Sequence, residues 1–310
     1  MLGFPAVAAA SSDAPTSMPS AAGPRQRATT VIPCRSLATS DSATITAVEV
    51  RLFPNSRRPG IGLRPRREGQ RPLLPQHARH CPVLEAGSTL GLLVFPPLEA
   101  HESFYLQFLG DGRYEFTYFL SGPDGKWQPL YCHTVTLPIT SIGMIREHVA
   151  FMVEDPPISP DEAMRVSRAF IVPEDLGTPP GALSLRGATN FQTPPGWDTV
   201  YTAVFNMIER PSAPMLVVRV ETDWYAHETE FRYVLQPGEG ISATQSMPIG
   251  QVFFVPREEI TLRDCTADEL TAIAESQKTF AEGKAAVRLT TAYGLSYSPH
   301  YLRESRSTKG

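Results

Sequence analysis

The chain has 310 residues, with 42% hydrophobic and 19% charged side chains and a formal net charge of −4. This length allows one large or two small domains, and the mildly acidic charge argues against a protein that binds polyanions over its whole surface. Thirty prolines, about twice the usual share, argue against a mainly helical fold, because proline breaks helices and central strands. No apolar run of about 18 residues is present, so no helix is expected to span a membrane.

The N-terminal extension at 1–46 is rich in Ala, Ser, Thr and Pro, and its only acids are Asp13 and Asp41. Such a segment buries too little apolar surface to offset the entropy of an ordered backbone, so it is expected to be disordered. Three alternatives stay open for it: a signal peptide, a transit peptide, or a start codon assigned too early. The expected organisation is this extension, a β domain at 47–262, and a helix with a tail at 263–310.

An arginine-rich segment follows the first expected strand, which the alternating residues 44–53 predict. Residues 51–79 contain eight arginines and one acid, Glu68, so this segment carries a net charge of +7. It is either a solvated loop that balances the acidic remainder of the chain, or an anion clamp, because the planar guanidinium matches carboxylate and phosphate. Nucleic acid is not an expected partner, since neither interleaved aromatic residues nor a recognition helix accompanies the segment.

The sequence pattern in the middle of the chain predicts strands separated by short turns. Residues 88–100 predict a buried strand that ends at a Pro-Pro pair. Residues 103–120 predict a hairpin, because two alternating aromatic runs flank a Gly-Asp-Gly turn. Short helices are expected at 139–150 and 159–169, and the second begins with the Ser-Pro-Asp-Glu sequence of a capped helix.

The C-terminal part starts with a capping box formed by Thr266 and Glu269, which predicts a helix to about Gly283 before a polar and aromatic tail. In total the patterns indicate about ten strands and three helices at turn-punctuated spacing. We therefore expect an all-β fold with minor α content. Its form would be an antiparallel β-sandwich or open barrel, with short inserted helices and a C-terminal helix packed on the outside.

The cysteines and most histidines form no strong disulfide or metal-binding pattern. No CxxC pair is present, and four cysteines in so long a chain favour reduced thiols in a cytoplasmic protein. These residues are Cys34, Cys81, Cys132 and Cys265. His77 and His80 have ligand-like spacing with Cys81, but the surrounding arginines disfavour a cation. The His-Glu pair at 101–102 and the Glu-His pair at 147–148 are expected at the surface.

One stretch, DWYAHETEFRYVLQPGEG at 223–240, carries most of the candidate chemistry. His227 and Glu230, followed by a strand and by a Pro-Ile-Gly sequence ending at Gly250, resemble a cupin that has lost some of its histidines. This resemblance implies a metal-dependent oxygenase with His227, Glu228 and Glu230 as ligands. In a strand, 228 and 230 would face one way and 227 the other, so the three converge only if the stretch is a loop. We assign no metal ligand and expect no cofactor.

A second resemblance covers residues 47–262. It depends on six motifs that keep their order along the chain. These are an arginine- and proline-containing segment after the first strand, Cys81-Pro82, Gly-Leu-Leu-Val-Phe-Pro-Pro from Gly91, Pro-Gly-Trp at 195–197, Glu-Thr-Asp-Trp at 221–224, and a closing segment at 247–258. Together they resemble an uncharacterised bacterial domain-of-unknown-function family. The resemblance implies the domain boundaries given above, and no activity follows from it.

The same region supplies acid/base candidates. Glu221 and Asp223 lie two residues apart, so on one strand face their proximity would raise the pKa of one carboxyl and suit it to general acid catalysis. His227 is a candidate base near neutral pH, and Glu230 is the fourth catalytic candidate. The expected substrate-binding residues are Trp197, Trp224, Tyr225 and Arg232, with the aromatic rings as an apolar wall. Alternatively, the two carboxylates face solvent at the strand end and the tryptophans belong to the core.

These patterns support three functional hypotheses. The first is an enzyme of bacterial specialised metabolism that cyclises, isomerises or hydrates a small organic molecule by metal-free acid/base chemistry. The second is a degenerate cupin-like, metal-dependent oxygenase, and the third is a non-catalytic binding or assembly module whose basic segment docks an acidic partner. The sequence lacks the Gly-x-Ser-x-Gly of a serine hydrolase and the strand–glycine–helix context of a dinucleotide site. The expected partner is a small-molecule substrate, with neither nucleic acid nor membrane involved, and the oligomeric state stays open.

Overall fold

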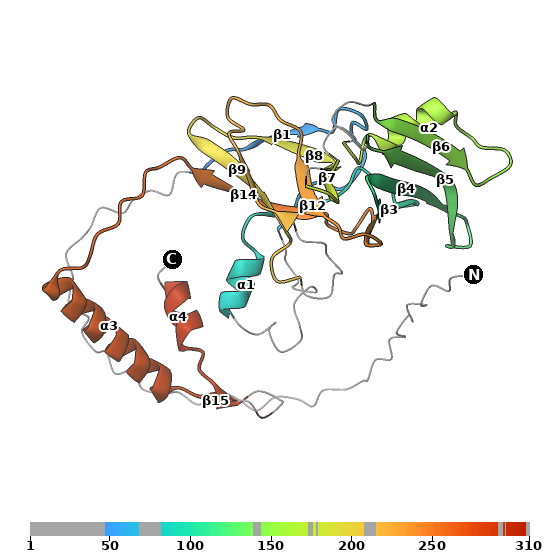
Figure 1. Cartoon of the computed structure of the whole chain (residues 1–310). Helices are drawn as coiled ribbons and strands as arrows, with labels where there is room; N and C mark the ends of the chain where they lie inside the picture. Colours follow the sequence, from blue (N-terminus) through green and yellow to red (C-terminus); the bar gives the residue numbers. More distant parts are fainter. Residues whose placement is uncertain are drawn as a thin grey trace. The chain divides into compact units, whose positions relative to one another are not determined.

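The structure is a computed structural model that describes residues 47–67, 82–138, 144–172, 176–177, 179–207, 215–290, 294 and 296–307. These residues form several antiparallel sheets and four helices (Figure 1). The expected all-β class with minor α content is confirmed. The sheets are open and sandwich-like, and none in the described part closes into a barrel. The extension at 1–46, His77, His80 and Cys81 lie outside the described residues.

The largest sheet has five strands in the order β13-β3-β4-β5-β6. Their bounds are Gly240–Thr244 for β13, Glu102–Gly110 for β3, Arg113–Ser121 for β4, Trp127–Thr136 for β5 and Arg146–Phe151 for β6. The expected hairpin is confirmed as β3–β4. It turns at Asp111, which takes a φ of 49° between two glycines that also have positive φ.

The helix expected at 139–150 is wrong over its described part, because residues 146–151 form strand β6, antiparallel to β5. Exposed and half-buried side chains alternate along β6 with a period of two. Hydrogen bonding to the edge of β5 therefore outweighs the local helix preference. Residues 139–143 lie outside the described part of the chain.

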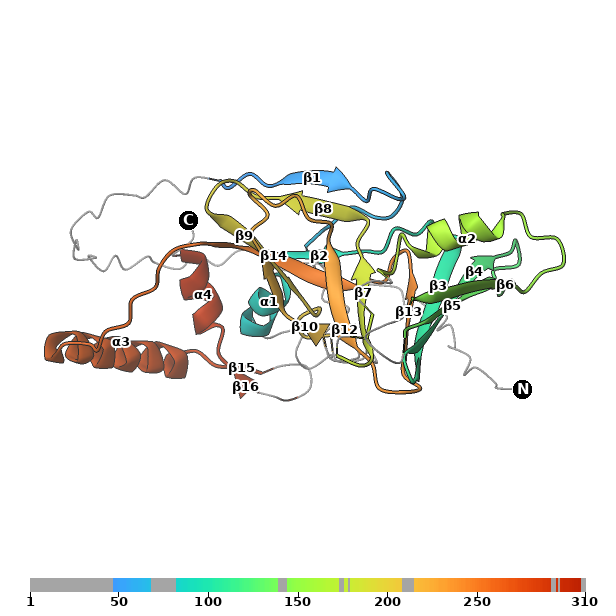
Figure 2. The ribbon, with the colours of Figure 1, turned by 45° about the horizontal axis from the view of Figure 1, so that its top comes forward.

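The remaining strands form smaller antiparallel sheets. The first has four strands in the order β11 (Val218–Val220), β9 (Trp197–Thr202), β14 (Gly250–Pro256) and β2 (Leu92–Val94). The second has three strands in the order β10 (Met215–Leu216), β12 (Glu230–Val234) and β7 (Ala182–Arg186). The third pairs β1 (Arg51–Pro54) with β8 (Thr189–Gln192). The strand expected at 44–53 is correct only in part, since the described residues 47–50 are not in a strand. Figure 2 shows β1 and β8 side by side.

A single hydrophobic core joins the five-stranded sheet to the smaller sheets. Its buried members include Phe104 and Phe116 from the large sheet and Tyr201, Phe231 and Val252 from the others. Alternating strand positions supply these side chains, as expected when one face of each sheet is buried.

Helix α2 (Pro160–Ser167) confirms the second expected short helix. The Ser159 hydroxyl accepts a hydrogen bond from the backbone N–H of Glu162, and Pro160 occupies the first turn. Ala163 and Ser167 are its buried residues, and the helix packs against β5 and β6. This packing places the exposed side of α2 beside the loop after β1 (Figure 2).

The C-terminal helix is α3 (Ala267–Ala286), and its capping box between Thr266 and Glu269 is confirmed. It continues past Gly283, and none of its side chains is buried, so the expectation that it packs on the sheets finds no support. Three other described features were not expected: α1 (Pro82–Ser88), α4 (His300–Ser307) and the pair β15 (Leu289–Thr290) with β16 (Ser296–Tyr297). Among the described helices, none combines the length and apolar character needed to cross a bilayer.

Candidate functional site

The connection between β11 and β12 is a loop, and this changes the geometry expected for Glu221 and Asp223. Strand β11 ends at Val220 and residues 222–224 form a turn, so the prediction that both carboxylates share a strand face is wrong. The turn closes when the backbone N–H of Tyr225 donates to the carbonyl of Glu221 at 3.0 Å. Short-range turn hydrogen bonds thus replace the ladder that the sequence pattern suggested.

Asp223 fixes this turn to its neighbours. Its carboxylate accepts hydrogen bonds from the backbone N–H groups of Gly196 and Trp224, each at 3.0 Å, and forms an ion pair with Arg257. The bond from Gly196, followed by the contact with Arg257, lowers the pKa of Asp223. Asp223 is therefore ionised at neutral pH, which is the opposite of the raised pKa that a general acid needs.

Arg257 links three carboxylates around the turn. Its Nε lies 2.9 Å from Asp198 Oδ1, and its terminal nitrogens contact Asp223 and approach Glu221 Oε2 to 3.7 Å. Arg219 binds the other oxygen of Asp198 at 2.6 Å. Asp198 is buried, so these contacts supply the compensation that a buried carboxylate requires. This half of the predicted catalytic set is part of a supporting ion-pair network.

The aromatic residues of the loop face solvent instead of lining an enclosed wall. Trp224 and Tyr225 are 69% and 49% exposed, whereas Trp197 is half-buried at the start of β9. The ring of Tyr225 lies between its neighbours, with centroids 5.7 Å from Trp224 and 5.1 Å from His227. The Trp224 indole N–H donates to Glu221, which fixes the outermost ring.

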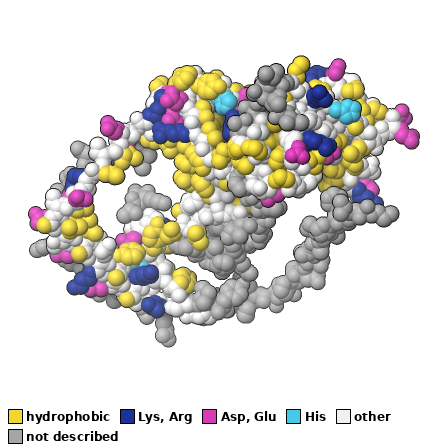
Figure 3. All heavy atoms as spheres, in the orientation of Figure 1, with side chains coloured by type: hydrophobic (Ala, Val, Ile, Leu, Met, Phe, Trp, Pro, Cys, Tyr) yellow, Lys and Arg dark blue, Asp and Glu magenta, His cyan; other side chains and the backbone are white. Residues whose placement is uncertain are grey.

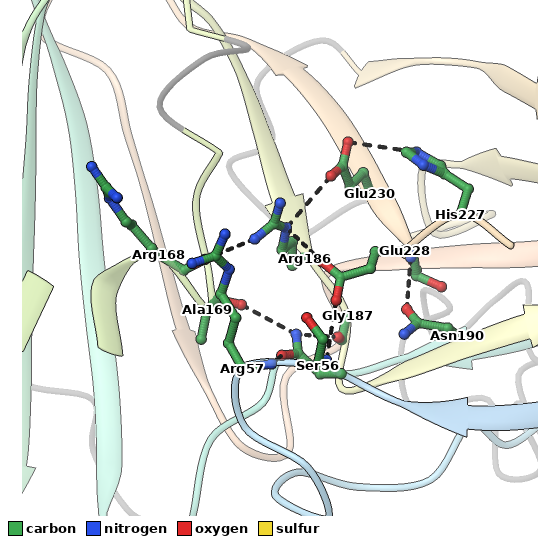
Figure 4. A network of polar contacts seen from close by, with 12 residues as sticks. Ser56, Arg57, Arg168, Ala169, Arg186, Gly187, Asn190, His227, Glu228 and Glu230 are labelled. Carbon is green, nitrogen blue, oxygen red and sulfur yellow. Dashed lines mark hydrogen bonds and ion pairs between the residues drawn. The ribbon is translucent and has the colours of Figure 1, made fainter. Parts of the chain in front are cut away.

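His227, Glu228 and Glu230 gather around Arg186 at the end of β7 (Figure 4). Arg186 Nε lies 3.1 Å from Glu228 and 3.5 Å from Glu230, and His227 Nε2 lies 3.7 Å from the other oxygen of Glu230. The expectation that His227 faces away from Glu228 and Glu230 assumed a strand, and it does not apply because β12 begins only at Glu230. Within the described residues, no three His, Cys, Asp or Glu side chains form a group that could hold a metal ion.

Glu228 connects this network to the loop after β1. Its Oε1 accepts the backbone N–H of Ser56 at 3.1 Å, and the next residue along the chain is Arg57 (Figure 4). Burial alone would raise the pKa of Glu228, but hydrogen bonds from Ser56 and the charges of Arg186 and Arg57 outweigh it and lower that pKa. The carboxylate is therefore charged at neutral pH and holds the loop in place.

Asn55 anchors the same loop from below. The side chain is buried, and its Nδ2 donates to the carbonyls of Ala169 and Gly187 at 3.3 and 3.0 Å. Its Oδ1 accepts the backbone N–H groups of Arg57 and Arg58 at 2.9 and 3.1 Å, which makes the local turn typical of asparagine.

Arg58 and Glu102 form a buried ion pair beneath the loop. Two N–O contacts of 2.7 Å join the guanidinium to the carboxylate, and Arg58 also donates to the carbonyl of Pro97 at 2.8 Å. The expectation that Glu102 lies at the surface is wrong, because Glu102 shares the inward face of β3 with Phe104 and Leu106. The alternation of Glu102 with Phe104 and Leu106 in the sequence is the signal that predicts its inward position.

A pocket of about 360 Å³ opens between this loop and α2. Its lining consists of Arg57, Arg58, Pro59, Ile61, Glu162, Arg165 and Val166. Arg165 makes no ion pair with another described residue, and Arg57 acts on Glu228 through its charge without an ion pair. The basic loop thus presents cationic groups to a concave site, as the anion-clamp interpretation requires.

Arg232 lies in the middle of β12, where it pairs in register with Leu216 and Ser184. By strand alternation it shares a face with Glu230, while Phe231 on the other face is part of the core.

His133 is a further buried titratable residue. Neither ring nitrogen has a hydrogen-bond partner among the described residues, and burial lowers the pKa of His133. Nearby Glu147, expected at the surface, is largely buried and binds Arg168 at 2.5 Å. Cys132 and Cys265 are free thiols, and burial raises the pKa of Cys132 to about 11.

Comparison with known proteins adds no family assignment. Neither a scan against protein-family models nor a search of curated proteins finds a match to this chain. The functional reading therefore depends on the geometry described above.

Proposed function

We propose that the protein binds a small organic anion, a carboxylate or phosphate with a short apolar part, in the pocket between the loop after β1 and α2. One observation carries this proposal: three arginines, Arg57, Arg58 and Arg165, line one pocket of about 360 Å³ that contains a single carboxylate, Glu162. Concave sites with a few charged groups and apolar walls are the usual places for small ligands.

The three arginines differ in their freedom to contact a ligand. Glu102 engages both terminal nitrogens of Arg58, so this residue mainly shapes the floor of the pocket. Arg57 and Arg165 are exposed, and their guanidinium groups suit bidentate bonds to a carboxylate or phosphate. Ile61 and Val166 supply apolar surface for the uncharged part of the ligand.

The pocket is built in advance of binding. Asn55 and Glu228 fix the backbone of the loop through hydrogen bonds to Arg57, Arg58 and Ser56. The capped helix α2 provides the opposite wall. A site whose walls are already ordered loses less conformational entropy when the ligand binds.

Acid/base catalysis on a small molecule bound beside His227, outside the arginine pocket, is the second candidate, and the network in Figure 4 favours it. His227 is 28% exposed and lies 3.7 Å from the nearly buried Glu230, so the carboxylate can orient the imidazole. Arg186 and Glu228 connect this pair to Ser56, beside the pocket residue Arg57. In this candidate His227 moves the proton and Glu230 holds the ring, in a metal-free cyclisation, isomerisation or hydration.

Calorimetric titration of the full chain with a panel of small mono- and dicarboxylates and organic phosphates tests the binding proposal. Arg57→Gln and Arg165→Gln should each weaken the tightest interaction by about tenfold. Arg113→Gln, the same change at an exposed position on β4, is the matched control and should leave affinity unchanged. Equal affinities in all four proteins, or no binding by the unmodified protein, would contradict the proposal.

The catalytic candidate needs a separate variant. His227→Gln should abolish turnover of the substrate bound beside it, while the affinity of the arginine pocket for its anion stays within about twofold, because His227 is not part of that pocket's lining. If this variant turns over the substrate as fast as the unmodified protein, His227 is not the catalytic base.

A further inference from the structure

The loop 221–229 presents a row of three rings, Trp224, Tyr225 and His227, which are not part of the arginine pocket. Trp224 is 69% exposed, yet it is the end of a row in which Tyr225 follows at 5.7 Å and an interplanar angle of 35°. His227 continues the row at 5.1 Å and 13°. The Tyr225 and His227 rings run nearly parallel, the indole ring is tilted against that of Tyr225, and the indole stays largely exposed at the end of the row.

Several bonds hold this stack in one conformation. The Trp224 indole N–H donates to Glu221, and its backbone N–H donates to Asp223. Beneath the turn, the buried hydroxyl of Thr222 bonds with Thr193 and Thr199 at 2.9 and 2.7 Å. A large apolar ring that is both exposed and immobilised is a preorganised contact surface.

The charges beside the stack indicate what kind of ring would bind. Three carboxylates, Asp198, Glu221 and Asp223, are paired with the two guanidinium groups of Arg219 and Arg257, so the formal charges of this cluster nearly cancel. Figure 3 likewise shows acidic and basic side chains interspersed with apolar ones on the face drawn. A polyanion would meet the carboxylates and a cation would meet the arginines, so a neutral ligand fits this surface best.

The arrangement of the rings favours a neutral sugar ring over a cation as the ligand. Recognition of a cation by several aromatic groups needs ring faces that converge on it, whereas here the three rings lie in a row with Tyr225 between Trp224 and His227. A pyranose offers an apolar C–H face that can pack on the open indole face. Its hydroxyls can donate to Glu221, which is half exposed, and accept from Arg257.

We propose that Trp224, with Glu221 and Arg257 at its edge, binds the pyranose ring of a neutral carbohydrate. Trp224 supplies the stacking face and the two charged side chains bind the hydroxyl groups. Trp224 is not part of the pocket lined by Arg57 and Arg165, so a lack of carbohydrate binding would not contradict the proposed anion binding, and the reverse also holds.

The test is calorimetric titration of the full chain with an array of neutral oligosaccharides that includes maltohexaose, cellohexaose and chitohexaose, because heat is measured equally well when Trp224 is replaced. At least one should bind with a Kd of about 1 mM or tighter. Trp224→Ala should weaken that interaction by more than about tenfold, while Trp224→Phe, which keeps a stacking face, should weaken it by about threefold or less.

Trp127→Ala is the matched control, because Trp127 is also exposed, at 42%, but has no part in the stack. It should leave affinity unchanged. The proposal is overturned if no neutral oligosaccharide in the array binds, or if Trp224→Ala binds as well as the unmodified protein. It is also overturned if sedimentation shows self-association that Trp224→Ala abolishes, since the stack would then be covered by a second copy of the chain.

Discussion

Arg58 and Glu102 meet fork to fork, with both N–O distances at 2.7 Å, although 44 residues separate them in the sequence. Their side chains are only 12% and 7% exposed, so each charge depends on the other for compensation. The pair joins the arginine-rich loop to the first strand of the largest sheet. It therefore ties the floor of the proposed anion pocket to the core.

Removal of one partner of this pair should destabilise the fold strongly. Glu102→Ala leaves the Arg58 charge buried without compensation, so the free energy of unfolding in urea should fall by about 3 kcal/mol. Asp124→Ala, which removes an exposed pair with Lys126, should change it by less than about 0.5 kcal/mol. Similar losses in both variants would mean that the Arg58–Glu102 pair is effectively solvated.

Acid should weaken the same interaction. Burial opposes ionisation of Glu102, but hydrogen bonds from Arg58 and from the backbone of Glu99 outweigh it and lower the pKa of Glu102 below its ordinary 4.5. The stabilisation is therefore present above pH 4.5 and is lost as the pH falls through the lowered pKa. Urea unfolding measured across that acid range should show a shallower pH dependence in Glu102→Gln than in the unmodified protein.

His133 should produce a pH dependence at higher pH. Burial keeps it neutral in the fold and lowers its pKa from 6.5, so the unfolded chain binds the extra proton and stability falls as the pH drops below 6.5. His133→Leu should flatten this slope and raise stability near neutral pH by about 1 kcal/mol, because an unpaired polar ring leaves the core.

His148→Leu is the control for this prediction, since His148 is exposed on the adjacent strand β6. It should keep the slope of the unmodified protein. Identical slopes in His133→Leu and the unmodified protein would contradict the prediction, because the pKa of His133 would then be the same in the folded and the unfolded chain.

Asn55 should matter for both stability and ligand binding. Asn55→Ala removes four hydrogen bonds that hold the loop carrying Arg57 and Arg58, and the free energy of unfolding should fall by about 2 kcal/mol. The anion affinity should fall as well, because the loop is no longer ordered before binding. Calorimetry beside urea unfolding gives both values, and Gln128→Ala, at an exposed position on β5, serves as the control. Unchanged affinity in a destabilised variant would show that the pocket forms without this anchor.

Some elements could be predicted because a few adjacent residues determine them. The capping box at Thr266 and Glu269, the proline-started α2 and the Gly-Asp-Gly hairpin depend on contacts within a few residues, and all three are present. Strand β6 could not be recognised, because its conformation depends on pairing with β5. Local pattern also misplaced the end of β11 and thus the relation between Glu221 and Asp223.

The candidate site was predictable as a set of residues and not as a geometry. His227 and Glu230 are three residues apart in the sequence, which predicts one site for both, and the two are neighbours in the fold. Their central partner, Arg186, is 44 residues from Glu230 in the sequence and reaches it only through the pairing of β7 with β12. Arg165 was equally hidden, because its role depends on α2 packing beside the loop after β1.

Helix α3 is stabilised by different interactions from those that stabilise the sheets. It has 20 residues and none of its side chains is buried, so backbone hydrogen bonds, its cap and a contact with α4, in which the ring centroids of Phe280 and His300 lie 4.9 Å apart, hold it together. Glu269, with a pKa lowered to about 2, accepts bonds from Arg263 and from the backbone of Thr266 at the first turn. Heating should accordingly produce two events in one chain: a broad, non-cooperative loss of helical ellipticity, and a sharp transition of the sheets at a temperature that removal of α3 leaves unchanged.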